Sequence, residues 1–201
     1  MNAGTDALKY QALTQQEIPA AAKLCAQAML HNPIHIKVFG ADEQRRLQRL
    51  QYFFPALLAY VYKKGQLEGA FDGQRLVGVM GALPPHHCTP TVPDGMRMLP
   101  SILRANNPVG WYRIAIWLGT WARLDPTEGH WHLGPLAVDR DYRRQGIGSR
   151  LFTQSLDKND GFPFYLETDM LRNVQLYERY GFEVTATPTI LKTPCWIMRR
   201  H

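Results

Sequence analysis

Hydrophobic and polar positions follow helical and strand periods in turn along the chain, and this pattern predicts a mixed α/β protein. Two apolar runs, residues 66–71 and 75–83, flank Asp72-Gly73, a dipeptide typical of a tight hairpin turn. We therefore expect them to pair as antiparallel strands. Apolar residues at helical spacing mark further segments, at residues 42–62, 102–124, 147–157 and 172–180.

The N-terminal part opens with a short strand expected at residues 10–13. Thr14 followed by Glu17 has the spacing of a capping box, which predicts a helix through about Leu30. Residues 31–40 should break that helix. Pro55 lies inside the next helical pattern and predicts a kink or a division into two pieces, because proline lacks the amide proton of an interior turn.

The middle of the chain is rich in proline and then in tryptophan. Residues 84–100 are expected to be irregular, and residues 102–124 to form one short and one longer helix separated at residues 106–108. The aromatic side of these helices suits either an ordinary core or the wall of a substrate pocket.

The C-terminal third has the predicted order β-α-β-α-β-β. A strand at residues 130–138 is interrupted by Gly134-Pro135, and Gly181 follows the last helix at a position that favours glycine. The other predicted strands lie at residues 162–168, 182–187 and 195–200.

Length and composition fit one soluble domain over residues 1–201. No apolar run approaches the roughly 20 residues that span a bilayer, and the N-terminus lacks the pattern of a secretory signal. The three cysteines, Cys25, Cys88 and Cys195, are far apart and odd in number. A reducing, cytoplasmic location is therefore expected.

The formal net charge of +6 suits a polyanionic partner, which includes nucleic acid, acidic membrane and phosphorylated cofactors. No basic run and no interleaving of basic and aromatic residues points to nucleic acid. We therefore expect neither a nucleic-acid nor a membrane partner.

The densest basic cluster is RRQGIGSR, residues 143–150, directly before a predicted helix. Glycines at 146 and 148 let backbone amides approach an anion closely, and a helix start offers unpaired N–H groups. The segment lacks the Gly-Lys-Ser/Thr of a P-loop and the third glycine of a Rossmann fingerprint. It remains a candidate phosphate site.

The pattern Arg-x-x-Gly-x-Gly, filled by Arg143, Gly146 and Gly148, resembles the GNAT superfamily of N-acetyltransferases. It is preceded by LGPLAVD and followed by LETDMLRNVQLYERYGFEV. The latter segment and the ending CWIMRR are similar to the puromycin N-acetyltransferase-like branch. The resemblance implies a single-domain α/β fold whose mixed central sheet has splayed parallel strands flanked by helices.

The resemblance also implies that acetyl-CoA binds between the strands ending at Val138 and Thr168. Backbone groups of Leu136 and Val138, two residues apart on a strand, would pair with the pantetheine arm. Asn173 either contacts that arm or caps its helix. The residues expected to bind the cosubstrate are Leu136, Ala137, Val138, Arg143, Arg144, Gln145, Gly146, Ile147, Gly148, Ser149, Asn173 and Tyr177.

The family chemistry implies three catalytic candidates. Tyr177, one helical turn from Asn173, would protonate the departing thiolate, although a core role for this tyrosine is the alternative. An attacking amine must lose a proton, and Glu167 and then His132 are the candidate bases. The pair His86-His87 beside Cys88 invites a zinc reading, but its spacing is wrong for a ligand set and we expect no metal.

The sequence therefore predicts an acetyl-CoA-dependent N-acetyltransferase acting on a small amine in a ternary complex, with residues 84–126 forming an insertion that shapes the acceptor site. A transferase using another acyl-CoA, and a non-catalytic acyl-CoA sensor, remain alternatives. Homodimers are frequent in this superfamily, so a homodimer stays open.

Overall fold

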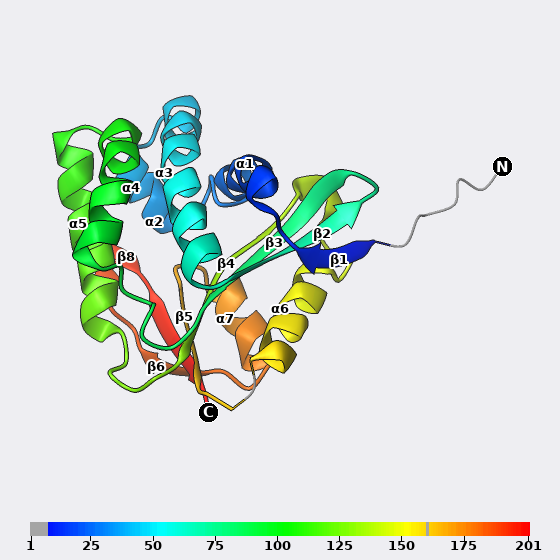
Figure 1. Ribbon diagram of the computed structural model, residues 1–201. Coiled ribbons are helices and arrows are strands. Elements are labelled where there is room, and N and C mark those ends of the chain that lie inside the picture. The colour runs from blue at the N-terminus through cyan, green and yellow to red at the C-terminus, as the bar shows by residue number, and fades with distance from the viewer. Residues whose placement is uncertain (1–7, 160) are drawn as a thin grey trace.

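The strands assemble into one mixed sheet in the order β1-β2-β3-β4-β5-β9-β6, in a computed structural model that describes residues 8–159 and 161–201 (Figure 1). Neighbouring strands are antiparallel except β4 and β5, which are parallel. A two-stranded ribbon, β7–β8, stands apart. The strands are β1 (Lys9–Ala12), β2 (Gln66–Asp72), β3 (Arg75–Leu83), β4 (Trp131–Val138), β5 (Phe164–Thr168), β6 (Glu183–Ala186), β7 (Thr189–Ile190), β8 (Thr193–Pro194) and β9 (Trp196–Arg200).

Helices cover both faces of this sheet (Figure 1). Helices α1 to α5 pack around one apolar core and α6 and α7 around the other, so the sheet lies between two helical layers. No helix of the described residues is both long and apolar enough to cross a bilayer. The helices are α1 (Ile18–Ala28), α2 (Pro33–Phe39), α3 (Glu43–Lys64), α4 (Val92–Ala105), α5 (Pro108–Leu124), α6 (Ile147–Lys158) and α7 (Leu171–Glu178), with short 3-10 turns at Gln15–Glu17 and Arg140–Tyr142.

Local sequence signals account for much of this arrangement. The capping box of Thr14 and Glu17 is present, with the Glu17 carboxylate accepting from the Thr14 amide at 2.6 Å. The Asp72-Gly73 turn joins β2 to β3 as predicted. The predicted apolar face of α6 is buried, including Leu151 and Phe152. These expectations are confirmed.

The helical expectations are confirmed only in part. Helix α1 ends at Ala28, so the predicted break is confirmed, but residues 31–40 then contain a further helix, α2, that was not predicted. Helix α2 begins at Pro33, a position where proline costs no helical hydrogen bond. Helix α3 continues through Pro55 as one element, so the division into two pieces is wrong. Residues 84–100 are only partly irregular, because α4 starts at Val92 after the Thr91 hydroxyl accepts from the Asp94 amide at 3.4 Å.

Strand β4 carries a bulge where the sequence placed an interruption. Met80 pairs with Leu136 but Ala82 pairs with Leu133, so Gly134-Pro135 together lie opposite Gly81 alone. A side chain at Gly81 would have its Cβ 2.5 Å from the Gly134 carbonyl oxygen. Glycine at 81 is thus required by the close approach of the bulged strand.

The bulge changes which side chains face which helical layer. Before it, Leu133 packs into the core under α6 and α7, and after it Leu136 and Val138 contact that same core. Ala137 instead belongs to the core under α1 to α5. His132, one residue before Leu133, therefore faces the α1–α5 side.

Candidate functional site

Strands β4 and β5 part shortly after they begin. Their parallel pairing consists of Trp131 with Phe164 and His132 with Tyr165. Strand β4 then continues to Val138 and β5 to Thr168 without pairing to each other. The two strand ends therefore flank a gap in the middle of the sheet, where the sequence places the cosubstrate.

Beyond His132, the edge of β4 that faces this gap pairs with no other strand of the described residues, although the Val138 carbonyl accepts from Arg143. The Asp139 amide donates to the Val77 carbonyl of β3 at 2.9 Å. Backbone groups alternate along a strand, so Ala137 also points to β3 while Leu136 and Val138 point to the gap. These two residues can pair with an extended ligand as a further strand would.

The N-terminus of α6 lies just beyond the end of β4. Gly146 is its N-cap, with φ of 78°, a left-handed conformation that favours glycine, and no side chain of the described residues caps the helix. The amides of Ile147, Gly148 and Ser149 precede the first intrahelical bond, from Arg150 to Gly146. A Cβ on Gly148 would lie 3.3 Å from a Val138 methyl, so the helix start contacts the strand closely.

The polar side chains of this turn mostly hold the turn itself. The Arg143 guanidinium donates to the carbonyls of Val138 and Ala28, both at 3.3 Å. The Gln145 side chain donates to the Asp141 carbonyl at 3.3 Å. Arg144 has a positive φ of 64°. The glycines and backbone amides, rather than these side chains, form the cradle that an anion would use.

Helix α7 contributes Asn173 and Tyr177 beside the end of β5. The side-chain amide of Asn173 donates to the Thr168 hydroxyl at 3.1 Å, and this bond ties the start of α7 to the end of β5. The Tyr177 ring packs 5.1 Å from that of Phe152, in the core under α6 and α7. Burial raises the pKa of Tyr177 to about 12, so this hydroxyl keeps its proton at neutral pH.

The other two catalytic candidates lie together on the opposite face. His132 Nε2 lies 2.8 Å from a Glu167 carboxylate oxygen, and the Glu167 side chain is 4% exposed. Burial opposes the imidazolium, but the adjacent Glu167 charge raises the pKa of His132 well above its usual range. The structure thus makes one partly buried pair of residues that the sequence treated as separate candidates.

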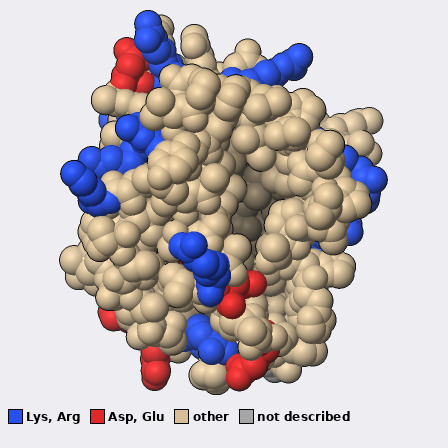
Figure 2. Space-filling model, turned by 90° about the vertical axis from the view of Figure 1, so that its left-hand side faces the viewer, with Lys and Arg blue, Asp and Glu red and all other residues tan. Residues whose placement is uncertain are grey.

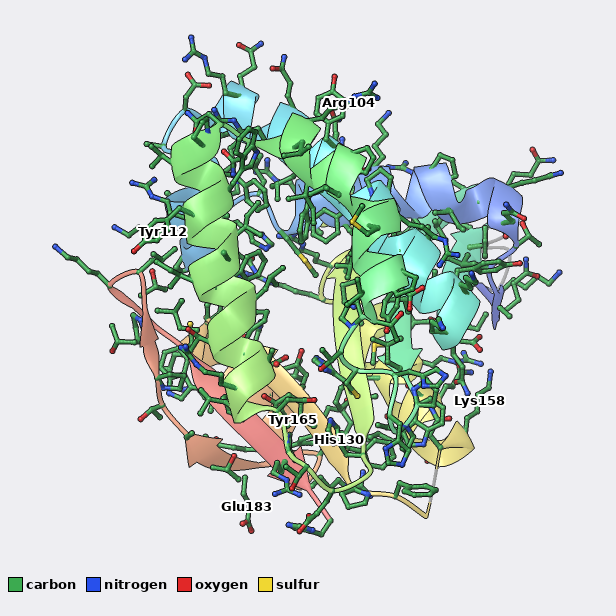
Figure 3. All side chains as sticks on the ribbon, turned by 60° about the vertical axis from the view of Figure 1, so that its left-hand side comes forward. Arg104, Tyr112, His130, Lys158, Tyr165 and Glu183 are labelled. Atoms are coloured by element: carbon green, nitrogen blue, oxygen red, sulfur yellow. The ribbon has the colours of Figure 1, made fainter. Side chains whose placement is uncertain are left out.

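The α4–α5 face of the molecule is hollowed near its centre, and the hollow is lined mainly by uncharged residues (Figure 2). Tyr165 and His130 lie at the end of α5 nearest the strands (Figure 3). The ring centroids of Tyr165 and His132 are 5.2 Å apart. The His132–Glu167 pair therefore lies beneath the helices on this side of the sheet.

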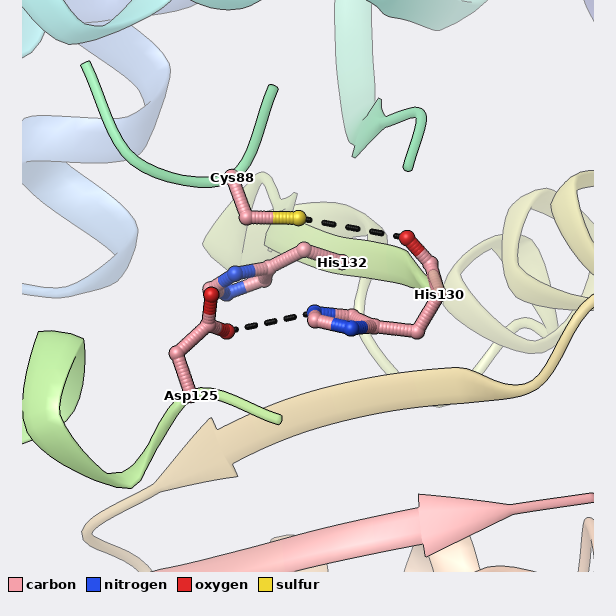
Figure 4. Close-up of side chains that lie close together, drawn as sticks. All are labelled: Cys88, Asp125, His130 and His132. Carbon is pink, nitrogen blue, oxygen red and sulfur yellow. Dashed lines mark hydrogen bonds and ion pairs between the residues drawn. The ribbon is translucent and has the colours of Figure 1, made fainter. Parts of the chain in front are cut away.

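His132 also belongs to a cluster of four side chains that sequence reasoning missed. The cluster consists of Cys88 from the segment after β3, Asp125 from the end of α5, and His130 and His132 from the start of β4 (Figure 4). As a possible metal ligand, Cys88 was considered only with the adjacent His86 and His87, which are not in the cluster. The signal that could have found the cluster is His130-Trp131-His132, two histidines on one face of a strand.

The sequence profile of the Acetyltransferase (GNAT) family matches residues 32–182 of this chain. Solved structures with a similar fold each cover 96% of the chain, at low sequence identity. One, described as histone acetyltransferase HPA2 and related acetyltransferase, is from Corynebacterium glutamicum, with a TM-score of 0.74, 20% identity and 95% of that chain covered. An agmatine N-acetyltransferase has a TM-score of 0.63 and 15% identity, over 98% of its chain. Naa50 of Arabidopsis thaliana, in complex with the bisubstrate analogue CoA-Ac-MVNAL, has a TM-score of 0.53 and 15% identity, over 98% of its chain.

Proposed function

The chain belongs to the GNAT acetyltransferase family, and from this premise we propose that it transfers the acetyl group of acetyl-CoA to a primary amine. The observation that carries the proposal is the gap between β4 and β5. Around it lie a strand edge at Leu136 and Val138 that no neighbouring strand covers, the N-terminus of α6 and the partly buried Glu167–His132 pair. Each of these features serves a different part of an acyl-transfer reaction.

The donor-binding part uses backbone groups. Leu136 and Val138 would pair with the pantetheine arm, and the amides of residues 147–149 would bind the pyrophosphate together with the positive end of the α6 dipole. Gly146 leaves this cradle open, because nothing lies within 4 Å of where its Cβ would be. Acetyl-CoA supplies the activated thioester, and the residues around it position the acceptor.

The chemistry is a direct attack in a ternary complex. The amine nitrogen bonds to the acetyl carbon, the carbon–sulfur bond breaks, and the amine proton passes to the Glu167–His132 pair. A backbone N–H near Leu136 stabilises the oxyanion, and Tyr177 gives its proton to the leaving thiolate. Burial keeps Tyr177 protonated for this role, with a pKa of about 12.

The acceptor is proposed to be a small amine with apolar bulk, bound under residues 84–126. The hollow on the α4–α5 face is mainly uncharged, which suits such a molecule better than a strongly basic peptide (Figure 2). A cytoplasmic location, where acetyl-CoA is made and used, is part of this proposal.

The experiment that tests this proposal is a matrix of acyl donors against acceptors, read by mass spectrometry of the products. We expect acetylated small arylalkyl or alkyl amines with acetyl-CoA. If a longer acyl-CoA transfers its acyl group faster than acetyl-CoA does, acetyl-CoA is not the preferred donor and this part of the proposal is wrong. Tight CoA binding with no acylated product for any acceptor would favour the acyl-CoA sensor instead.

A further inference from the structure

We propose that Cys88, Asp125, His130 and His132 bind a transition-metal ion, with Zn²⁺ the best match. One ligand atom from each of the four lies within 4.8 Å of the others (Figure 4). Zinc prefers four ligands of this kind, a thiolate, imidazole nitrogens and a carboxylate oxygen. Tetrahedral bonds of about 2.0–2.3 Å place ligand atoms roughly 3.3–3.8 Å apart, so the cluster needs to contract by about an ångström.

The outer contacts of the two histidines support a metal site. A histidine that binds a metal through one nitrogen usually donates from the other to a carboxylate or backbone carbonyl. His132 Nε2 contacts Glu167 at 2.8 Å, and His130 Nδ1 contacts the Glu128 carbonyl at 2.8 Å. Both rings are therefore already oriented, with His132 Nδ1 and His130 Nε2 left on the side of the cluster.

The second ring nitrogen of His132 is a candidate ligand atom. His132 Nδ1 is buried and has no hydrogen-bond partner among the described residues. A buried polar atom without a partner destabilises the fold, and a metal bond at this nitrogen would remove that cost. His130 Nε2 instead contacts an Asp125 oxygen at 3.1 Å, an attraction that the ion would replace by binding both.

The charges of the cluster also balance an ion of this kind. A Cys88 thiolate and an Asp125 carboxylate carry two negative charges between them, which match Zn²⁺ with two neutral imidazoles. A pocket of about 100 Å³ is lined by Cys88, Asp125 and His130, among others, and gives an ion a route to the site. The His130 side chain itself is 4% exposed, so the bound ion would be largely shielded from water.

Such an ion would link both ends of the 84–126 segment to the sheet. Cys88 lies near its start and Asp125 follows α5 at its end. His130 directly precedes β4, and His132 is the second residue of that strand. The metal would fix α4 and α5 over the proposed acceptor site. It would also hold the His132 ring against Glu167, so that the carboxylate remains available as the proton acceptor of the proposed function.

The test is metal retention by the full chain. Protein stripped with a chelator is mixed with Zn²⁺, passed over a desalting column and assayed by mass spectrometry of the metal. We expect about one zinc per chain for the unmodified protein. Cys88→Ser and His130→Gln should lower zinc affinity at least tenfold, while His87→Gln, the same change next to Cys88 but outside the cluster, should bind as the unmodified chain does.

Co²⁺ and the thiols give a second readout that needs no variant. Co²⁺ at this site should show a sulfur-to-cobalt charge-transfer band. In the metal-free folded chain a thiol reagent should modify Cys88, since Cys25 and Cys195 are fully buried, and Zn²⁺ should block that reaction. No zinc retention, equal retention in Cys88→Ser, or a Cys88 thiol that reacts equally fast with Zn²⁺ present would overturn the proposal.

Discussion

Replacing Gly146 with alanine tests the phosphate cradle at the start of α6. Gly146 has φ of 78°, and a left-handed backbone costs a residue with a side chain about 1–2 kcal/mol. Apart from the adjacent chain, no described residue places an atom within 4 Å of the new Cβ, so the folded chain bears the backbone cost alone. Typical domains are stable by about 5–15 kcal/mol, so Gly146→Ala should remain folded.

The effect on the cosubstrate should be larger than this strain explains. The new methyl group points into the open space where the pyrophosphate is proposed to lie, and it would keep the phosphate from the α6 amides. We expect CoA affinity, measured by isothermal titration calorimetry, to fall at least tenfold, which corresponds to about 1.4 kcal/mol.

Gly181→Ala is the matched control for this change. Gly181 follows α7 with φ of 80°, and its new Cβ would meet only Arg200 atoms, at 3.9 Å. It should lose similar stability in urea unfolding while CoA affinity stays the same. If Gly146→Ala binds CoA as tightly as Gly181→Ala does, the pyrophosphate is not at the start of α6 and the reasoning from the glycines fails.

Three further changes test other parts of the structure. Tyr177→Phe should lower turnover about 10²- to 10⁴-fold in steady-state assays with little change in acetyl-CoA affinity, and unchanged turnover would leave Tyr177 a core residue. Gly81→Val places its Cβ against the Gly134 carbonyl and should lower the free energy of unfolding by about 1–3 kcal/mol in urea titrations, whereas a neutral result would contradict the bulge. Burial raises the pKa of Cys25 from 9.0 to about 12, so between these pH values the unfolded thiol loses its proton before the folded one. The free energy of unfolding should therefore fall as pH rises through that range, by at most about 1.4 kcal/mol per pH unit for this thiol, and Cys25→Ala should reduce the slope measured by urea titration; an unchanged slope would refute the assignment to Cys25.

The sequence predicted best those features that depend on neighbouring residues. Asp72-Gly73 specifies a turn through its own backbone preferences, and Gly134-Pro135 disturbs a strand wherever that strand lies. The helix start at Gly146 is equally local, because the free amides belong to the first turn itself.

The features that the sequence missed depend on contacts between distant segments. Helix α4 was obscured by its prolines, although Thr91 and Asp94 contain a cap that tolerates proline in the first turn. In the cluster around His130, Cys88 lies close to Asp125 although helices α4 and α5 separate them in the sequence. Their spacing along the chain therefore gives no sign that they are close in space. The sequence shows that His130 and His132 lie on one face of a strand, but it does not show that the end of α5 brings Asp125 next to them.

The central claim, that this chain catalyses acetyl transfer to an amine, is tested most directly by release of free CoA from acetyl-CoA across a panel of small amines. The account predicts thiol release that depends on the amine, saturates with at least one apolar amine and falls sharply in Tyr177→Phe. Acetyl-CoA that binds at the cradle but releases no CoA above the amine-free rate, for any amine of the panel, would contradict it.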